Sequence, residues 1–215
     1  MEYKHNQIRI SRTAHFFSSG NPMAPTAWLL THGYAMTAEQ MMLKFQDFSQ
    51  EDNLIISAEG LSYFYWEGKG QRVPLSSWMT SRHRLSEIRD YSQYLFDLYS
   101  KFEKPALKIL LGFSQGGTTM WRFINEMKPD FDCFINWAGD IPEDTEYDIE
   151  YLKGKNLIYF SGDQDPYITQ SRLSILKERS KNEGLNVAFN SYEGPHKVDR
   201  LVLKKWYNSF IKNKD

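Results

Sequence analysis

The sequence has very little cysteine and no long apolar segment. Cys133 is the only cysteine in 215 residues, so no disulfide can form within the chain. No run approaches the roughly 18 apolar residues of a membrane-spanning helix, and the polar start of the chain lacks the apolar core of a signal peptide. Disulfides belong mainly to oxidising compartments. These absences predict a cytoplasmic protein without integral membrane association.

The sequence also lacks a surplus of charge of either sign. Lys and Arg total 26 against 27 Asp and Glu, which gives a formal net charge of −1 at pH 7. Electrostatic binding to nucleic acid or to anionic membranes requires a basic surface, so no nucleic-acid partner is expected. No group of His, Cys and Asp has the spacing of metal ligands, so no metal site is predicted either.

Short apolar runs alternate with segments of helical periodicity, and there is no repeat or flexible linker. This alternation predicts an α/β fold with a mostly parallel central sheet and helices on both faces, as a single domain over residues 1–215. The expected strands cover residues 7–17, 28–31, 53–57, 108–113, 131–137, 156–161 and 186–192. The expected helices follow residue 37, cover residues 82–102, 116–127 and 170–182, and begin near residue 198.

Two local patterns add detail to this outline. Thr37 and Gln40 have the spacing of a capping box at the start of the first helix. Residues 59–81 contain glycine, proline and many aromatic side chains without a clear period. A loop of this length in a compact domain is often functional.

Residues 110–117 contain the most informative motif of the chain. Gly112, Ser114 and Gly116 form the pattern G-x-S-x-G, a nucleophile elbow in which a sharp turn from strand to helix exposes a serine. Glycines at these positions remove Cβ atoms that would collide where strand and helix approach. An apolar strand precedes Ser114 and a helical pattern follows it. This context favours a nucleophile over a small-residue turn.

The base and the acid that would activate Ser114 are expected after it in the chain. Elbow triads run in the order serine, acid, histidine, and His196 is the only one of the five histidines that follows Ser114. A loop between them offers two carboxylates. Asp165 precedes a proline and so favours extended backbone, whereas Asp163 suits a turn. We predict His196 as the base and Asp165 as the acid, and we expect Asp140 to be a solvated loop residue.

An oxyanion hole requires two fixed N–H donors near the nucleophile. The residue after the serine supplies one of them in elbow enzymes, and here it is Gln115. The second is expected from the loop after an early strand, where His32 and Gly33 precede Tyr34. We predict the N–H groups of Tyr34 and Gln115 as the donors. His32 is expected to be structural, because it precedes the nucleophile.

Together these motifs resemble the phospholipase/carboxylesterase family of α/β-hydrolases, which includes acyl-protein thioesterases. The shared pieces, in chain order, are His32-Gly33, Gly112-Phe113-Ser114-Gln115-Gly116-Gly117, Gly162-Asp163-Gln164-Asp165-Pro166 and Gly194-Pro195-His196. The resemblance implies the α/β-hydrolase fold, with Ser114 as nucleophile and Asp165 as acid. It implies hydrolysis of small-molecule carboxylic esters or thioesters through an acyl-enzyme, without a metal or organic cofactor.

The substrate is the least constrained part of the prediction. Trp78, Met79, Trp137 and Ile168 are expected to lie on loops above the serine, where they would line the acyl site. Two indoles in one site would leave room for short to medium acyl groups. The alternative is that Trp78 and Trp137 are packed as core. A peptidase or another acyl hydrolase on the same fold, or a non-catalytic ligand-binding protein, stays open as an alternative function.

Overall fold

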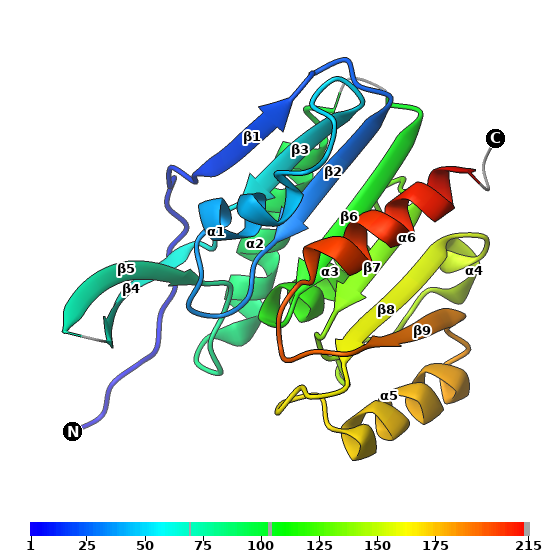
Figure 1. Cartoon of the computed structure of the whole chain (residues 1–215). Coiled ribbons are helices and arrows are strands. Elements are labelled where there is room, and N and C mark those ends of the chain that lie inside the picture. The colour runs from blue at the N-terminus through cyan, green and yellow to red at the C-terminus, as the bar shows by residue number, and fades with distance from the viewer. Residues whose placement is uncertain (69, 103–104, 213–215) are drawn as a thin grey trace.

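The apolar runs of the sequence pair into one seven-stranded sheet in a computed structural model, which describes residues 1–68, 70–102 and 105–212 (Figure 1). The strand order is β1-β3-β2-β6-β7-β8-β9, with β1 antiparallel to β3 and the other neighbours parallel. The bounds are β1 Phe16–Gly20, β2 Thr26–Thr31, β3 Asn53–Ala58, β6 Leu107–Phe113, β7 Cys133–Trp137, β8 Asn156–Gly162 and β9 Val187–Tyr192. Because β2, β6, β8 and β9 run parallel, the loops that follow them meet at one edge of the sheet.

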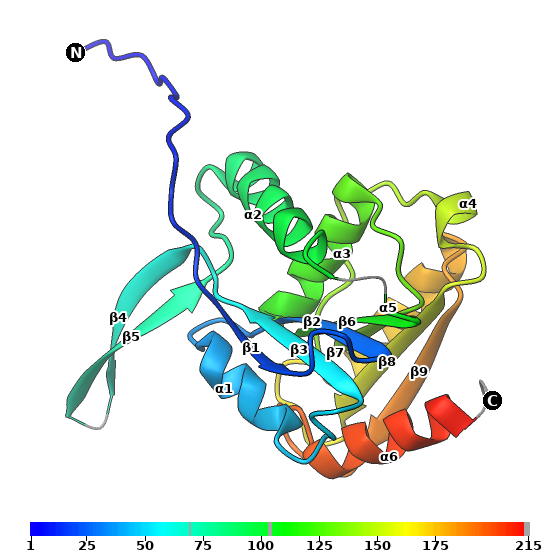
Figure 2. The ribbon, with the colours of Figure 1, turned by 90° about the horizontal axis from the view of Figure 1, so that it is seen from above.

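Helices cover both faces of this sheet, as predicted. Their bounds are α1 Ala38–Met42, continued by a 3₁₀ turn at Leu43–Phe45, α2 Arg84–Tyr99, α3 Gln115–Met127, α4 Ile149–Leu152, α5 Gln170–Asn182 and α6 Arg200–Lys212. Figure 2 shows α2 and α3 on one face and α1 and α6 on the other. This covering explains why β2, β3 and β7 are buried along their whole length. In the described part of the chain, none of the helices is long and apolar enough to cross a bilayer.

An aromatic cluster joins α6 to the 3₁₀ turn that follows α1, on the face of the sheet that both elements cover. The buried Trp28 ring packs edge-on against Phe45 at 5.0 Å and against Tyr207 of α6 at 5.2 Å. The Trp28 indole N–H donates to Asn53 Oδ1 at 2.9 Å, so the ring is buried without an unpaired donor. Segments from near the two ends of the fold are therefore held in one core.

The capping box at the start of α1 is confirmed. The N–H of Gln40 donates to Thr37 Oγ1 at 3.2 Å, and the N–H of Thr37 donates to Gln40 Oε1 at 3.1 Å. These reciprocal bonds satisfy amide groups that the first turn of a helix leaves unpaired.

The expectation that residues 59–81 form an irregular loop is wrong. Most of this segment is an antiparallel hairpin of β4 Ser62–Gly68 and β5 Gln71–Ser77, with residue 69 outside the described residues. In Figures 1 and 2 the hairpin projects away from the central sheet. Its side chains therefore lack the one-sided burial that makes a strand recognisable in a sequence.

Two further expectations are corrected at the ends of elements. Strand β1 begins at Phe16, and most of residues 7–15, expected as strand, are exposed without regular structure. Residues Phe16–Gly20 already pair with the length of β3 from Ala58 back to Leu54, so that edge has no room for an earlier strand. Helix α2 runs from Arg84 to Tyr99 instead of from residue 82 to residue 102, and although the helical pattern predicted Leu85 to face inward, this residue is 75% exposed in the first turn.

Candidate active site

Ser114 occupies a sharp turn between β6 and α3. Its backbone has φ 53° and ψ −120°, a region that favours glycine. A Cβ on Gly112 would lie 2.4 Å from the carbonyl oxygen of Gly116, so the strand and the helix can approach this closely only with glycine there. The predicted elbow is therefore present, and it leaves the Ser114 side chain partly exposed.

His196 lies between Ser114 and Asp165, within hydrogen-bonding distance of each. His196 Nε2 is 2.9 Å from Ser114 Oγ, and His196 Nδ1 is 2.6 Å from Asp165 Oδ2. With the ring proton on Nδ1, His196 donates to the carboxylate and accepts the serine hydroxyl proton. The Asp165 side chain is fully buried, whereas the His196 ring keeps 15% of its surface exposed.

Backbone donors fix the second oxygen of Asp165. Its Oδ1 accepts hydrogen bonds from the N–H groups of Tyr167 at 2.8 Å and Ile168 at 2.9 Å. These bonds satisfy a carboxylate that is removed from water, and they hold its Oδ2 toward His196. The extended backbone that proline imposes on the preceding residue contributes to this arrangement.

The other two carboxylates considered from the sequence point elsewhere. Asp163 Oδ1 accepts the N–H of Gly194 at 2.9 Å, which ties the loop after β8 to the loop after β9. Asp140 accepts bonds from Arg172 Nε at 3.0 Å and Nη2 at 2.8 Å. Asp163 thus braces a turn, and Asp140 is part of a surface ion pair instead of being merely solvated.

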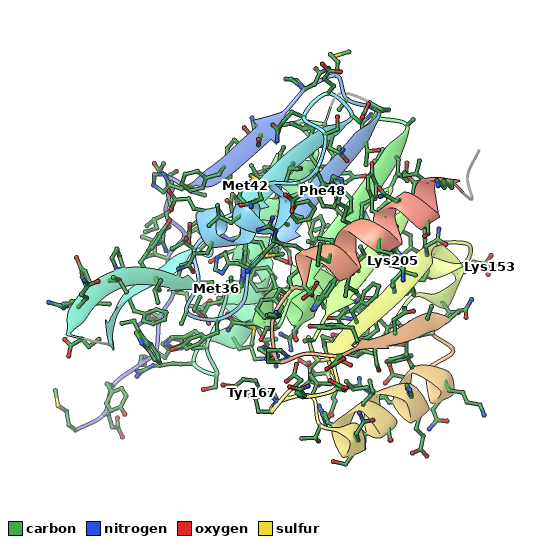
Figure 3. The ribbon with its side chains drawn as sticks, viewed as in Figure 1. Met36, Met42, Phe48, Lys153, Tyr167 and Lys205 are labelled. Atoms are coloured by element: carbon green, nitrogen blue, oxygen red, sulfur yellow. The ribbon has the colours of Figure 1, made fainter. Side chains whose placement is uncertain are left out.

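Two aromatic rings flank His196. The Phe113 ring lies 4.9 Å from the imidazole, and the Tyr167 ring packs edge-on against it at 4.8 Å. Tyr167, which is labelled in Figure 3, is 72% exposed and lies on the loop between β8 and α5. These two contacts restrict the movement of the imidazole, whose Nε2 is directed at Ser114.

The loop after β2 packs against the elbow, where the oxyanion donors were expected. Thr31 Oγ1 donates to the carbonyl of Gly116 at 2.9 Å, which joins the two segments. As the first residue of α3, Gln115 has an N–H group without a helical partner. In the part of the chain that the structure describes, the N–H of Tyr34 has no hydrogen-bond acceptor. Both predicted donors are therefore available to a ligand.

The side chain of Gln115 anchors the segment that follows β5. Its Oε1 accepts the N–H of Trp78 at 3.1 Å and the hydroxyl of Ser77 at 3.2 Å. Its Nε2 donates to the carbonyl of Met79 at 2.9 Å. The base of the hairpin is in this way attached to the residue next to Ser114.

A model of the serine hydrolase (FSH1) family matches residues 29–202, which is most of the chain. The chain belongs to this family. The matched residues include the elbow at Ser114 and the loops of this chain that contain Tyr34, Asp165 and His196. A comparison with curated proteins finds no match.

Solved structures of esterases and thioesterases share the fold of this FSH1-family chain. Acyl-protein thioesterase 2 of Zea mays has a TM-score of 0.70 at 13% identity, with 94% of this chain and 98% of that chain covered. A Mesorhizobium loti carboxylesterase has a TM-score of 0.66 at 12% identity, covering 86% and 89%. A Bacillus cereus carboxylesterase has a TM-score of 0.66 at 13% identity, covering 91% and 94%.

At these identities the likeness shows the fold alone. It confirms the α/β fold with a mostly parallel sheet that the alternation of elements predicted, and the α/β-hydrolase fold that the resemblance implied. The resemblance to phospholipase/carboxylesterase α/β-hydrolases is likewise confirmed, with the FSH1 family as the group to which the chain belongs.

Four residues were expected to line the substrate site, and the structure gives three of them little surface. Trp78 and Trp137 are 1% and 0% exposed. The Trp78 indole N–H donates to the carbonyl of His32 at 2.9 Å, and that of Trp137 to the carbonyl of Lys197 at 2.9 Å. The side chain of Ile168 is also buried, and Met79 is half-buried. Burial with paired N–H groups favours the core alternative for both indoles in the FSH1-family chain.

Sequence reasoning missed Phe64 and Tyr167, two aromatic residues near the site. Phe64 of the hairpin stacks on Tyr34 with ring centroids 5.2 Å apart, and the exposed Tyr167 packs against His196. The position of Tyr167 two residues after Asp165 was a usable signal, because that spacing places it beside the acid. No local signal could have paired Tyr34 with Phe64, because the hairpin was not recognised.

Proposed function

We propose that the chain hydrolyses carboxylic esters or thioesters of short to medium acyl groups through an acyl-enzyme on Ser114. The observation that supports this most directly is the pair of contacts from His196, 2.9 Å to Ser114 Oγ and 2.6 Å to Asp165 Oδ2. A serine hydroxyl becomes an effective nucleophile when an oriented base takes its proton. Membership of a serine hydrolase family supports the same chemistry.

The first half of the reaction forms the acyl-enzyme. Ser114 Oγ attacks the acyl carbonyl carbon while His196 Nε2 accepts the hydroxyl proton. The N–H groups of Tyr34 and Gln115 donate to the oxygen that becomes negative in the tetrahedral intermediate. His196 then gives its proton to the leaving alcohol or thiol as the bond from carbon to that oxygen or sulfur breaks. Asp165 keeps the imidazole oriented and stabilises its positive charge.

The second half releases the acid. His196 takes a proton from a water molecule, which attacks the acyl carbon of the ester on Ser114. The same two N–H groups meet the second tetrahedral intermediate. Collapse of that intermediate returns the proton to Ser114 Oγ and releases the carboxylic acid. The cycle requires no group beyond these side chains, these amides and water.

The acyl group is expected to lie on the exposed aromatic surface next to Ser114. Trp78 and Trp137 fill the interior below the loops, so an acyl chain has no indole-lined wall to enter. Tyr34, stacked on Phe64, offers a short apolar surface instead. Each methylene that this surface covers adds up to about 0.8 kcal/mol, and methylenes beyond it stay in water. This supports short to medium acyl groups.

Two measurements test the proposal. A fluorophosphonate should label Ser114 rapidly, with the labelled residue identified by peptide mass spectrometry. A series of p-nitrophenyl esters and matched thioesters should give kcat/KM values that rise over the first methylenes and stop rising at medium length. A wild-type protein that is not labelled and cleaves neither series would refute the hydrolase. A rate that keeps rising to palmitoyl esters would refute only the acyl preference.

A further inference from the structure

A buried polar cluster lies behind the oxyanion loop. Its members are His32 directly after β2, Glu59 directly after β3 and Ser76 in β5. The Ser76 hydroxyl is 2.5 Å from Glu59 Oε1 and 3.0 Å from His32 Nε2. All three residues are almost fully buried, which is unusual for a carboxylate. The reaction proposed above uses none of them.

The protons in this cluster can be assigned from its geometry. Burial lowers the pKa of His32, against the opposing charge of Glu59, so the imidazole is neutral. Its Nδ1 donates to the carbonyl of Gly33 at 2.7 Å, and its Nε2 accepts the N–H of Gly60 at 2.9 Å. The Nε2 lone pair is therefore occupied, and the Ser76 hydroxyl proton goes to Glu59.

The carbonyl that His32 contacts belongs to the peptide group whose N–H is the Tyr34 donor. A peptide group is planar and trans, so its C=O and N–H point in opposite directions. Fixing the Gly33 oxygen against His32 therefore aims the Tyr34 N–H away from His32. A hydrogen bond to the carbonyl also polarises the peptide and strengthens its N–H as a donor.

Ser76 and Glu59 hold the remainder of the same loop. The N–H of Ala35 donates to the carbonyl of Ser76 at 3.2 Å, and the N–H of Ser76 donates to the carbonyl of Met36 at 3.1 Å. Glu59 Oε2 accepts the N–H of Ala38 at 2.9 Å. The peptide groups on both sides of Tyr34 are thus fixed, while the Tyr34 N–H is left without an acceptor among the described residues.

We propose that Glu59 and Ser76, together with His32, are positioning residues that orient the Tyr34 N–H as an oxyanion donor. The inference rests on the proposed function, because an oxyanion forms only if Ser114 attacks a carbonyl. Neither residue touches the substrate. Their contribution belongs to the transition state, since the oxyanion exists there and not in the bound ester.

The test compares Ser76→Ala with Ser92→Ala. Both changes remove a buried serine hydroxyl, but Ser92 lies in α2 and its Oγ has no partner among the described residues. The probes are p-nitrophenyl butyrate, for kcat and KM, and a trifluoromethyl ketone, whose adduct with serine places an oxyanion in the hole. Rates are divided by the amount of Ser114 that a fluorophosphonate labels at completion, so an unfolded fraction does not lower kcat.

Ser76→Ala should lower kcat by about 10- to 100-fold, because a misdirected donor forfeits part of the effect of the oxyanion hole. KM should stay within about threefold, and the ketone should bind more weakly by the same factor as kcat falls. Glu59→Gln, which keeps the side-chain shape, should act in the same direction. Ser92→Ala should match the wild type in all three quantities.

Three results would overturn the inference. One is a Ser76→Ala protein with the kcat of Ser92→Ala. The second is a loss of kcat with unchanged ketone affinity, since the defect would then lie outside the oxyanion hole. The third is a wild type that neither turns over nor is labelled, which would overturn the proposed function as well. An active wild type with an unaffected Ser76→Ala refutes the positioning role alone.

Discussion

Ser114 is held in a backbone conformation that only glycine adopts without strain. Such a conformation costs a non-glycine residue about 1–3 kcal/mol, which the surrounding fold must offset. The elbow requires this strained conformation, because it directs the Ser114 hydroxyl out of the turn toward His196. Stability and reactivity therefore oppose each other at this residue.

This opposition predicts different effects for two substitutions of Ser114. Ser114→Ala should abolish turnover by several orders of magnitude and keep the strain. Ser114→Gly should abolish turnover equally and unfold at a higher denaturant concentration, with a gain of about 1 kcal/mol over Ser114→Ala. Ester assays and urea denaturation measure the two effects. Turnover above a few per cent in either variant would refute Ser114 as the nucleophile.

Asp165 and Asp163 are two residues apart and are expected to differ in their effect on the rate. Asp165→Asn should lower kcat about a thousandfold or more, because an amide in place of Oδ2 no longer favours the His196 tautomer with its proton on Nδ1. Asp163→Asn keeps an oxygen for the N–H of Gly194 and should change kcat far less. Steady-state kinetics on both variants decides this. Equal losses would contradict the assignment of the acid to Asp165 alone.

At the scale of elements, the hairpin β4–β5 is the part of the fold that sequence patterns did not predict. A strand is recognised when its burial alternates, but β4 is exposed along most of both faces. The reverse error occurred near the N-terminus, where Ile8 and Ile10 alternate with polar residues although both are exposed. Alternating apolar and polar residues show which face a strand could bury, but they do not show whether the sheet has a free edge with which that strand can pair.

Elements that are defined locally were predicted well. The strand before Ser114, its glycines and the helix after it follow from packing within a few residues, and helix α5 has the bounds that its pattern indicated. The three residues Ser114, Asp165 and His196 were found because chain order and loop context restrict the choice. The cluster of His32, Glu59 and Ser76 depends on three separate strands, so no local pattern reveals it.

Burial of Trp78 changes what its removal should do. From the sequence this indole could either limit acyl length or pack as core, and it lies in the core between the loop after β2 and α2, where it packs against Tyr91 at 6.1 Å. Trp78→Ala should destabilise the protein by about 3–5 kcal/mol. Trp66→Ala, at an exposed site on the hairpin, should change stability by about 0.5 kcal/mol or less. Equal denaturation midpoints for the two variants would contradict the core assignment.

At the scale of the whole molecule, the neutral His32 links stability to pH. Burial lowers its pKa from the ordinary histidine value of 6.5, so the folded chain leaves it unprotonated where the unfolded chain binds a proton. Stability rises with pH wherever the unfolded state binds more protons. The free energy of unfolding should therefore fall as pH drops below about 6.5, by up to about 1.4 kcal/mol per pH unit, and level off below the folded pKa.

Urea denaturation between neutral and mildly acidic pH measures this slope. His32→Gln should be less stable at neutral pH but should lose less stability on acidification, because one titrating group is gone. The carboxyl groups of Asp130, Asp148 and Asp199 have a lowered pKa and affect stability only at more acidic pH. Parallel pH profiles for the wild type and His32→Gln would show that His32 is not the group responsible.

The projecting hairpin also contains a tryptophan whose fluorescence can be distinguished from that of the core tryptophans. Among the six tryptophans, all within the described residues, Trp66 on β4 is exposed, Trp206 is half-buried and the other four lie in the core. A water-soluble quencher such as iodide should therefore quench the fluorescence of Trp66 at lower concentration than that of the buried tryptophans. Trp66 lies near the turn of the hairpin, on the strand whose Phe64 stacks on Tyr34, so its emission should respond to movement of the hairpin and very little to unfolding of the core. Iodide quenching of the folded protein can therefore follow the hairpin separately from the core.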